Sequence, residues 1–169
     1  FRTTIYVDIL GQGIGNSFSF DRLSSPSRKI KSSFSAGFTF LPFGKGELLY
    51  GIPIAYNVLL GRNNHHLETG MGASIMFFKA IRSSYYNYYY SQYPSRTGCL
   101  YITPRLGYRF QKPKGGIFLR GTLTPIIGIY NSFGDLYENT KFDFLGDYIG
   151  ISPELYPWFG ASIGYTLKN

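Results

Sequence analysis

The chain has 169 residues, a formal net charge of +8 and only 15% charged residues, compared with roughly 25% in soluble domains. Aromatic residues reach 19%, 21 residues are glycine, and no apolar run approaches the ~18 residues of a membrane-spanning helix. These values exclude a helical membrane protein. They favour a single-domain membrane β-barrel, in which strict alternation dilutes the apolar residues.

No basic-then-apolar stretch opens the chain, so we expect that any export signal has already been removed. Cys99 is the only cysteine. It cannot form an internal disulfide and, away from the N-terminus, cannot be a lipoprotein anchor. We interpret it as a small apolar residue that is buried or faces lipid.

The first half of the chain alternates apolar and polar residues with period two, the pattern of a strand with one apolar face. The clearest case is Phe34, Phe38 and Phe40, which alternate with serine, glycine and threonine. Glycine, proline and polar residues separate the alternating segments. We therefore predict strands at residues 3–10, 14–23, 30–41, 47–60 and 66–82, joined by turns at residues 11–13, 24–29, 42–46 and 61–65.

The first of these turns has two interpretations. Residues 11–13, Gly-Gln-Gly, fit either a tight turn or a bulge within one long strand. Single-chain bacterial outer-membrane barrels have an even number of strands, which favours the turn.

A predicted hairpin at residues 98–130, with its turn at residues 112–116, dominates the second half. Leucine, isoleucine and aromatic residues form one face of both strands, whereas threonine, glycine and arginine form most of the other. A last strand is predicted at residues 156–167, which brings the total to eight.

The predicted connections alternate in length. Those after the second, fourth and sixth strands are short, whereas residues 83–97 and 131–155 form long connections. Outer-membrane barrels have short periplasmic turns and longer outside loops, so we expect both chain ends to lie in the periplasm.

Three prolines fall inside predicted strands: Pro53, Pro104 and Pro125. Each removes a donor from a hydrogen-bond ladder. We therefore expect them at bulges or outside the hydrogen-bonded band.

A soluble lipocalin-like barrel also has eight antiparallel strands, but it has a polar exterior and an apolar interior. Here one face of nearly every predicted strand is purely apolar, and the other mixes glycine, hydroxyl and charged side chains. That second face is too polar to line a cavity for a fatty ligand and too rich in glycine for a solvated exterior. We therefore predict an all-β, eight-stranded antiparallel up-and-down transmembrane β-barrel over residues 1–169, with its apolar face toward lipid.

Three stretches carry a resemblance to known proteins: PRLGYRF at residues 104–110, KPKGG at 112–116 and PWFGASIGY at 157–165. On them the chain resembles small eight-stranded outer-membrane barrels of the OmpA/OmpX type and an uncharacterised small-barrel family of Bacteroidota. The resemblance covers most of the chain in architecture. It implies the outer membrane of a Gram-negative bacterium, with outer-membrane lipid around the barrel, but no particular function, because one fold hosts many.

The last strand also resembles the signal that the barrel-assembly machinery reads, with Gly160, Ile163 and Tyr165 at matching spacing. This resemblance implies contact with that machinery during insertion. The chain departs from the usual pattern because it ends on Leu-Lys-Asn rather than on an aromatic residue.

Five charged residues fall on faces that should line the barrel interior: Asp8, Glu68, Arg105, Arg109 and Arg120. An eight-stranded barrel is too narrow for an open pore. Isolated charges there would be very costly, so these residues must pair. The main interpretation is an ion-paired plug that holds adjacent strands together, and the alternative is a gated proton or ion path.

Catalysis has little support in the sequence. A lipid-modifying outer-membrane enzyme would use a histidine beside a serine or an acid near the outer leaflet. The only histidines, His65 and His66, fall at a predicted periplasmic turn near Glu68. Adjacent histidines at a turn are usually solvated and, with no cysteine nearby, make a poor metal site. We predict no catalytic residue, metal or cofactor, and keep a lipid-modifying enzyme as an alternative.

Six tyrosines crowd the first long connection: Tyr85, Tyr86, Tyr88, Tyr89, Tyr90 and Tyr93. Tyrosine offers rigid area with a polar tip, which suits contact with another envelope protein or a surface glycan. An aromatic girdle at the membrane interface would use the same property. The second long connection contains five acids, Asp135, Glu138, Asp143, Asp147 and Glu154. They lack EF-hand spacing, so we interpret this segment as a solvated acidic loop rather than a calcium site.

Basic residues gather at the predicted periplasmic end, where Asp21 is the only acid nearby: Arg22, Arg28, Lys29, Lys31, Arg62, Lys112, Lys114 and Lys168. Such a basic rim suits phospholipid headgroups, at about 1 kcal/mol for each residue, or an acidic periplasmic partner. Nucleic acid is excluded by the predicted location, although the net charge alone would allow it.

Together these patterns predict a non-enzymatic integral outer-membrane β-barrel whose interior is plugged by paired charges. Its expected role is structural, adhesive or that of an accessory subunit in an envelope assembly. The alternatives are a lipid-modifying enzyme and a narrow gated channel.

Overall fold

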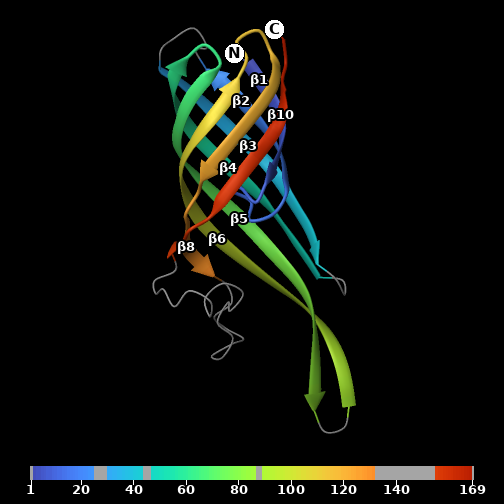
Figure 1. Cartoon of the computed structure of the whole chain (residues 1–169). Coiled ribbons are helices and arrows are strands. Elements are labelled where there is room, and N and C mark those ends of the chain that lie inside the picture. The colour runs from blue at the N-terminus through green and yellow to red at the C-terminus, as the bar shows by residue number, and fades with distance from the viewer. Residues whose placement is uncertain (1, 25–29, 44–46, 87–88, 132–154, 169) are drawn as a thin grey trace.

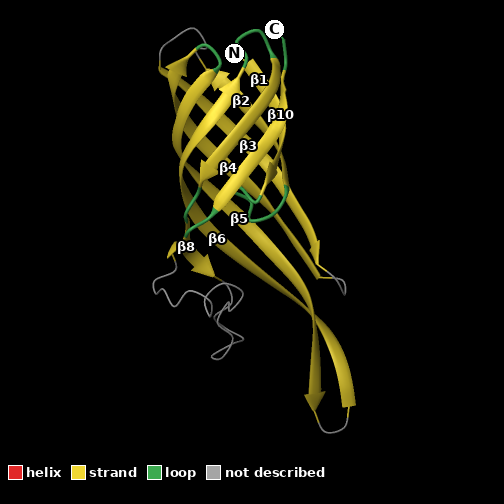
Figure 2. Ribbon diagram, viewed as in Figure 1, coloured by secondary structure: helices red, strands yellow, loops and turns green. Residues whose placement is uncertain are grey.

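The computed structural model describes residues 2–24, 30–43, 47–86, 89–131 and 155–168. For residues 43, 80–86, 89–97, 128–131 and 155–156 the description covers the backbone only. Figure 2 shows that the described residues form strands, loops and turns. No helix among them is long and apolar enough to cross a membrane.

Ten strand segments follow one another along the chain. They are β1 (Arg2–Ile9), β2 (Ser17–Ser24), β3 (Ile30–Phe43), β4 (Glu47–Arg62), β5 (His65–Tyr86), β6 (Tyr89–Gln111), β7 (Gly116–Leu123), β8 (Ile126–Asn131), β9 (Leu155–Tyr156) and β10 (Phe159–Thr166).

These segments build a closed barrel with eight strands in its wall. β7 and β8 both pair with β6, in the same register from Gln111 to Tyr101 and with a shift between Tyr101 and Leu100, and so count as one strand with a break. β9 and β10 likewise continue one another along β8 and β7. Each strand pairs antiparallel with its sequence neighbours, and β1 pairs with β10 to close the cylinder. The predicted all-β, up-and-down, eight-stranded fold is confirmed.

The two chain ends lie at the same end of the barrel (Figure 1), beside the turn that joins β6 and β7. At the opposite end β5 and β6 continue beyond the rest of the wall as a long two-stranded ribbon. The turn that joins β4 and β5 lies at this end as well. The 112–116 turn is tight because Gly115 and Gly116 adopt positive φ angles of 86° and 114°, which only glycine tolerates without cost.

The barrel has an inverted polarity. Phe34, Ile52 and Ile163 expose 52%, 55% and 57% of their surfaces on the outside. Serine, threonine, asparagine and arginine side chains point inward and are buried. Because successive residues of a strand point to opposite faces, this outcome confirms the predicted assignment of faces and contradicts a soluble barrel with an apolar core.

The three strand prolines lie where the ladders are interrupted. Pro53 lies in β4 between the pairs Ala36–Ile54 and Thr39–Gly51, a stretch in which the β3–β4 ladder is broken. Pro125 separates β7 from β8. Pro104 lies opposite this break. The β6–β7 ladder ends at Leu106 and the β6–β8 ladder ends at Ile102, so residues 103–105 of β6 have no partner in either strand. The expectation is therefore confirmed in part, because on their other sides Pro53 pairs with Ser74 and Pro104 with Met71 in unbroken ladders.

The first connection differs from the prediction. Residues 14–16 were assigned to the second strand, but β2 begins at Ser17, and residues 10–16 form a loop. Leu10 and Ile14 adopt positive φ angles of 55° and 61° near the two ends of this loop. Gly11, Gln12 and Gly13 between them, and Gly15 after them, are buried. The predicted tight turn is present, because the Ile14 N–H donates to the Gly11 carbonyl oxygen at 3.1 Å, but it lies within a longer loop that folds across the lumen.

The segment 83–97 also differs from the prediction. It was expected to be an irregular connection, yet β5 extends to Tyr86 and β6 starts at Tyr89. The two strands remain paired to their tips, through Tyr85–Tyr90 and Tyr86–Tyr89. Tyrosine and threonine favour extended backbone, so the tyrosine-rich composition that suggested a loop instead supports a hairpin. Residues 132–154, the acidic connection, lie outside the described residues.

Candidate functional site: the charged barrel interior

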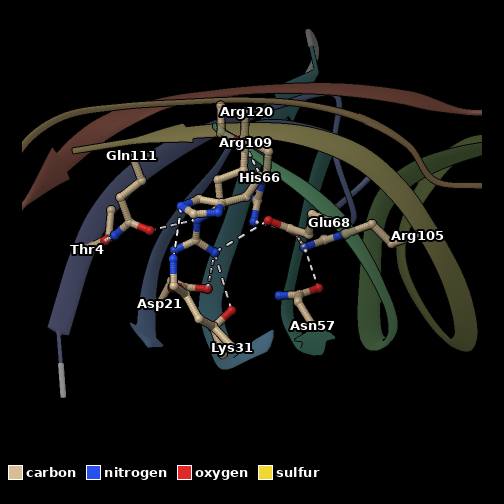
Figure 3. Close-up of polar contacts among 12 residues, drawn as sticks. Thr4, Asp21, Lys31, Asn57, His66, Glu68, Arg105, Arg109, Gln111 and Arg120 are labelled. Carbon is tan, nitrogen blue, oxygen red and sulfur yellow. Dashed lines mark hydrogen bonds and ion pairs between the residues drawn. The ribbon is translucent and has the colours of Figure 1, made fainter. Parts of the chain in front are cut away.

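All five predicted interior charges lie together inside the barrel. They come from β1, β5, β6 and β7, and Figure 3 shows most of them converging on Glu68. The exposed fraction is 0% for Glu68 and Arg109, 3% for Asp8, and 4% for Arg105 and Arg120. A sixth charge that the prediction left out, Asp21 of β2, completes the cluster and is also fully buried.

Strand register explains why these side chains meet. Glu68 is the cross-strand partner of Gly107, which lies between Arg105 and Arg109 on the inward face of β6. Arg109 is in turn the partner of Arg120 on β7. A side chain at position 107 has no room, because an added Cβ would lie 2.4 Å from the Gly121 carbonyl oxygen. The glycine thus allows the close approach of β6 to Gly121 and Thr122 of β7 at this level of the cluster.

The strongest contact is the pair of Arg109 and Asp21. The guanidinium donates from Nη2 to Oδ1 at 2.6 Å and from Nη1 to Oδ2 at 3.2 Å. Such a two-pronged pair is stronger and more directional than a single charged hydrogen bond. Arg109 Nε donates to Gln111 Oε1 at 3.0 Å, and Nη1 also reaches Ser33 Oγ at 3.3 Å. The guanidinium therefore has a partner on every nitrogen.

Glu68 is the hub of the network. Its carboxylate oxygens lie 3.4 Å from Arg109 Nη1, 3.4 Å from Arg120 Nη1 and 3.6 Å from Arg105 Nη1. One carboxylate therefore links three guanidinium groups from two strands to β5. Removal of one partner from such a buried set leaves an uncompensated charge. The loss of any one of these side chains should therefore lower the stability of the barrel, even where the whole set contributes little to the free energy of folding.

A second line of contacts crosses the seam where the barrel closes. Arg120 Nε donates to Ser162 Oγ at 3.0 Å, and Ser162 Oγ donates to Asp8 Oδ1 at 2.6 Å. These residues are cross-strand neighbours, because Ser162 pairs with Arg120 on one side and with Asp8 on the other. Asp8 thus ties β1 to the last strand and to the hub.

Two aromatic residues on the inward face support the arginines. The Arg120 guanidinium carbon lies 4.6 Å from the centre of the Tyr6 ring, and that of Arg109 lies 4.8 Å from the centre of the Phe118 ring. The two rings are themselves 5.3 Å apart. Guanidinium faces are weakly hydrated and stack well on aromatic rings. These contacts explain why Phe118 is fully buried among polar side chains inside the barrel.

Lys31 and His66 are corrections to the prediction. Lys31 was assigned to the exposed basic rim and His66 to a solvated turn, but their exposed fractions are 8% and 4%. Lys31 Nζ lies 3.5 Å from His66 Nε2 inside the barrel. Each is the second residue of its strand, so the alternation already points it inward. His65, one position earlier, is exposed and makes a short hydrogen bond with the Tyr108 hydroxyl.

The loop 10–16 closes the lumen at the end away from the termini. Gln12 Oε1 accepts a 2.7 Å hydrogen bond from Arg105 Nη2, and Gln12 Nε2 donates to the carbonyl oxygen of Ala73 at 3.2 Å. The carbonyl of Gln12 accepts from Tyr101 Oη at 3.0 Å and from Ser74 Oγ at 3.2 Å. One buried side chain thus joins the loop to β5, to β6 and to the arginine network, and sequence periodicity gave no sign of it.

The assembly-signal residues have a local structural explanation. Ile163 and Tyr165 are exposed on the outer face of β10. Gly160 packs against the loop, because an added Cβ there would lie 2.5 Å from the Cα of Gly11. A glycine at position 160 is therefore needed for the loop to fold inward. Recognition by the assembly machinery stays a prediction.

The other predicted surfaces are described in part. Arg62, Lys112 and Lys114 are exposed at the end that holds the termini, whereas Arg28 and Lys29 lie outside the described residues. Tyr88 also lies outside them, and for Tyr85, Tyr86, Tyr89, Tyr90 and Tyr93 the backbone alone is described. The rim and the tyrosine surface therefore stay predictions.

The arrangement ties several strands together. Glu68 is enclosed by guanidinium groups and fully buried. His65 is exposed on the opposite face of β5 from Glu68, whereas His66 is buried on the same face as Glu68. Within the described residues, no group of three or more His, Cys, Asp or Glu side chains is arranged to hold a metal ion.

No family model, curated protein or solved structure matches the chain.

Replacement of Arg109 by methionine should destabilise the barrel strongly, because Asp21 would lose its bidentate partner inside the lumen. We expect a loss of about 3–5 kcal/mol in the free energy of unfolding, the usual cost of breaking a buried ion pair, measured by urea titration of the refolded barrel. Arg62→Met, at an exposed position, is the matched control and should change it little. If Arg109→Met unfolds at the same urea concentration as this control, the network does not hold the strands together.

A pair of glycine substitutions on adjacent strands tests the inward fold of the loop. In Gly160→Ala the new methyl group would collide with the Gly11 backbone, whereas an added Cβ at Gly121 meets nothing within 4 Å. Overpacking of this kind costs about 1–3 kcal/mol, so Gly160→Ala should speed hydrogen exchange at residues 10–16. Gly121→Ala should leave that exchange unchanged. Equal protection of residues 10–16 in both variants would show that the loop does not pack against β10.

Proposed function

We propose that the chain is an integral outer-membrane β-barrel of a Gram-negative bacterium, closed to solutes, with a structural, adhesive or accessory-subunit role and no catalytic activity. The observation that carries this proposal is the inverted polarity of the closed barrel. Large apolar side chains cover the outside on every long strand, and ion pairs occupy the inside. A protein in water would have to leave that outer surface exposed, far beyond the few hundred Å² usual for a soluble monomer.

The outer surface of β10 illustrates the fit to lipid. Its outward residues are Phe159, Ala161, Ile163 and Tyr165, without a charge or an amide among them. On the outside of a membrane barrel an arginine or lysine at mid-membrane depth would cost about 2–4 kcal/mol. The alternation of such residues with buried Ser162 is the dyad pattern of a lipid-facing strand.

The filled interior favours a closed barrel over a channel. Guanidinium groups, aromatic rings and the Glu68 carboxylate fill the lumen beside β5, β6 and β7. The loop that contains Gln12 lies across one end of the barrel. An ion that crossed would have to separate charge pairs that are costly to break. We therefore keep a gated path as an alternative and not as the main proposal.

The two ends of the barrel suggest its orientation. Short turns and both termini share one end, and the ribbon of β5 and β6 projects from the other (Figure 1). In outer-membrane barrels the longer connections face outside the cell. The ribbon would then face outward, where adhesion or assembly takes place, and Arg62, Lys112 and Lys114 would meet inner-leaflet headgroups.

Lipid contact can be tested with single tryptophan probes. In a Trp158→Phe background, Phe38→Trp places the probe on the outer face and Phe118→Trp places it inside, at positions that are 51% and 0% exposed. In vesicles containing brominated lipid we expect strong fluorescence quenching for Phe38→Trp and little for Phe118→Trp. Quenching of neither probe, with the protein remaining in the aqueous phase, would refute a membrane location.

Planar-bilayer recordings separate the plug from a gated path. Removal of the hub in Glu68→Ala leaves three arginines without their shared carboxylate, so the free energy of unfolding should fall by about 3–5 kcal/mol. Conductance should stay at the baseline of lipid alone for both the native chain and the variant. Glu47→Ala, at the start of β4 and partly exposed, is the control for stability. Discrete conductance steps in the native chain that vanish in Glu68→Ala would instead support the path.

A further inference from the structure

The ribbon formed by β5 and β6 has two open edges. The ladder between β4 and β5 ends at the pair Leu48–Lys79, although β5 continues to Tyr86. On the other side, the ladder between β6 and β8 ends at Cys99–Asn131. Among the described residues, 80–86 of β5 and 89–95 of β6 therefore have each other as their only strand neighbours. Figure 1 shows this ribbon projecting from the barrel wall.

Open edges of this kind are templates for another strand. Along each edge, every second residue directs its backbone N–H and C=O away from the ribbon, ready to pair with an extended segment. The β6 edge contains Pro94, which has no N–H to donate. The β5 edge from Ala80 to Tyr86 has no proline and is the more complete template.

The charge of the ribbon limits what can pair with it. Lys79, Arg82 and Arg96 are the only charged residues between Glu68 and Arg105, and the sequence has no acid from residue 69 to residue 134. Two copies paired edge to edge would bring together two segments without any acidic residue, and in the register that sets Arg82 opposite Arg82 they would oppose like charges, which is destabilising. An acidic segment would meet complementary charge, which favours both encounter and correct register.

We propose that the β5 edge, residues 80–86, binds an extended acidic peptide segment of another envelope protein by strand addition. Backbone hydrogen bonds supply the attachment in this mode, and the side chains of the added strand supply specificity. The sequence positions of Arg82, within the edge, and of Lys79, at its base, give this segment a positive charge that favours an acidic partner. The inference deepens the proposed function and rests on it in one respect: the ribbon must lie in water outside the membrane.

The binding test uses the refolded chain in detergent micelles and three fluorescent nine-residue probes. The first alternates threonine and glutamate, the second replaces glutamate by lysine, and the third is the acidic peptide N-methylated at every residue. N-methylation keeps the carboxylates and removes the backbone donors. We expect the acidic peptide to bind at least about tenfold more tightly than either of the others, as measured by fluorescence anisotropy.

Two charge-reversal variants make the test specific to the edge. Arg82→Glu should weaken the acidic peptide and strengthen the lysine peptide, whereas Arg62→Glu, at the opposite end of the barrel, should change neither. If the N-methylated peptide or an oligogalacturonate binds as tightly as the acidic peptide, attraction is purely electrostatic and strand addition is wrong. Self-association of the chain that blocks the peptide would also overturn the proposal, because a second copy would then be the occupant.

The acidic residues of this chain itself supply the last control. If the acidic peptide binds only after Asp135, Glu138 and Asp143 are changed to asparagine or glutamine, the edge is occupied within the molecule and the proposal fails. Micelle binding does not depend on where the barrel resides in the cell. A negative result with an intact barrel therefore overturns strand addition alone, whereas the quenching of Phe38→Trp tests the membrane location separately.

Discussion

Burial of charge in a narrow cylinder is the constraint on which the rest of this structure depends. Three guanidinium groups lie inside the barrel with 0–4% of their surface exposed, where an unpaired charge would cost several kcal/mol. Each must therefore find carboxylates, hydroxyls or aromatic faces on other strands. Glu68, Asp21 and Asp8 meet this need from three separate strands, so the same contacts that neutralise the charge also fix the strands relative to one another.

The pattern of apolar and polar residues was sufficient to predict the wall of the barrel. Alternation placed Phe34, Ile52 and Ile163 outside and Glu68 and Arg109 inside, because a strand residue has only two faces to choose from. Asp21 lay on the correct face in the same pattern. It was not predicted among the interior charges because it falls close to the barrel end that holds the termini, where the neighbouring charged residues are basic. Register, which the pattern does not reveal, is what brings Asp21 to Arg109.

The parts that the sequence did not reveal have a shared physical cause. Residues 83–97 were assigned to a connection by composition and residues 14–16 to a strand by alternation, and neither signal reveals a long hairpin or a loop that folds inward. Gln12 becomes the centre of the loop only through contacts with Tyr101 and Arg105, which are remote in sequence. Lys31 and His66 were misplaced because they were assigned by their charge and their nearness to turns, although the alternation along β3 and β5 places both on the inward face.

The line of contacts from Asp8 through Ser162 to Arg120 has a consequence for how the cylinder is completed. The first and last strands are separated by almost the whole chain, and contacts of such long range form late and slowly. If the first and last strands paired in a shifted register, many backbone hydrogen bonds would still form, but the Asp8 carboxylate would be buried without its guanidinium partner. The ion pair at this seam therefore lowers the free energy of the correct register relative to shifted ones, and so helps to specify how the two ends of the chain pair.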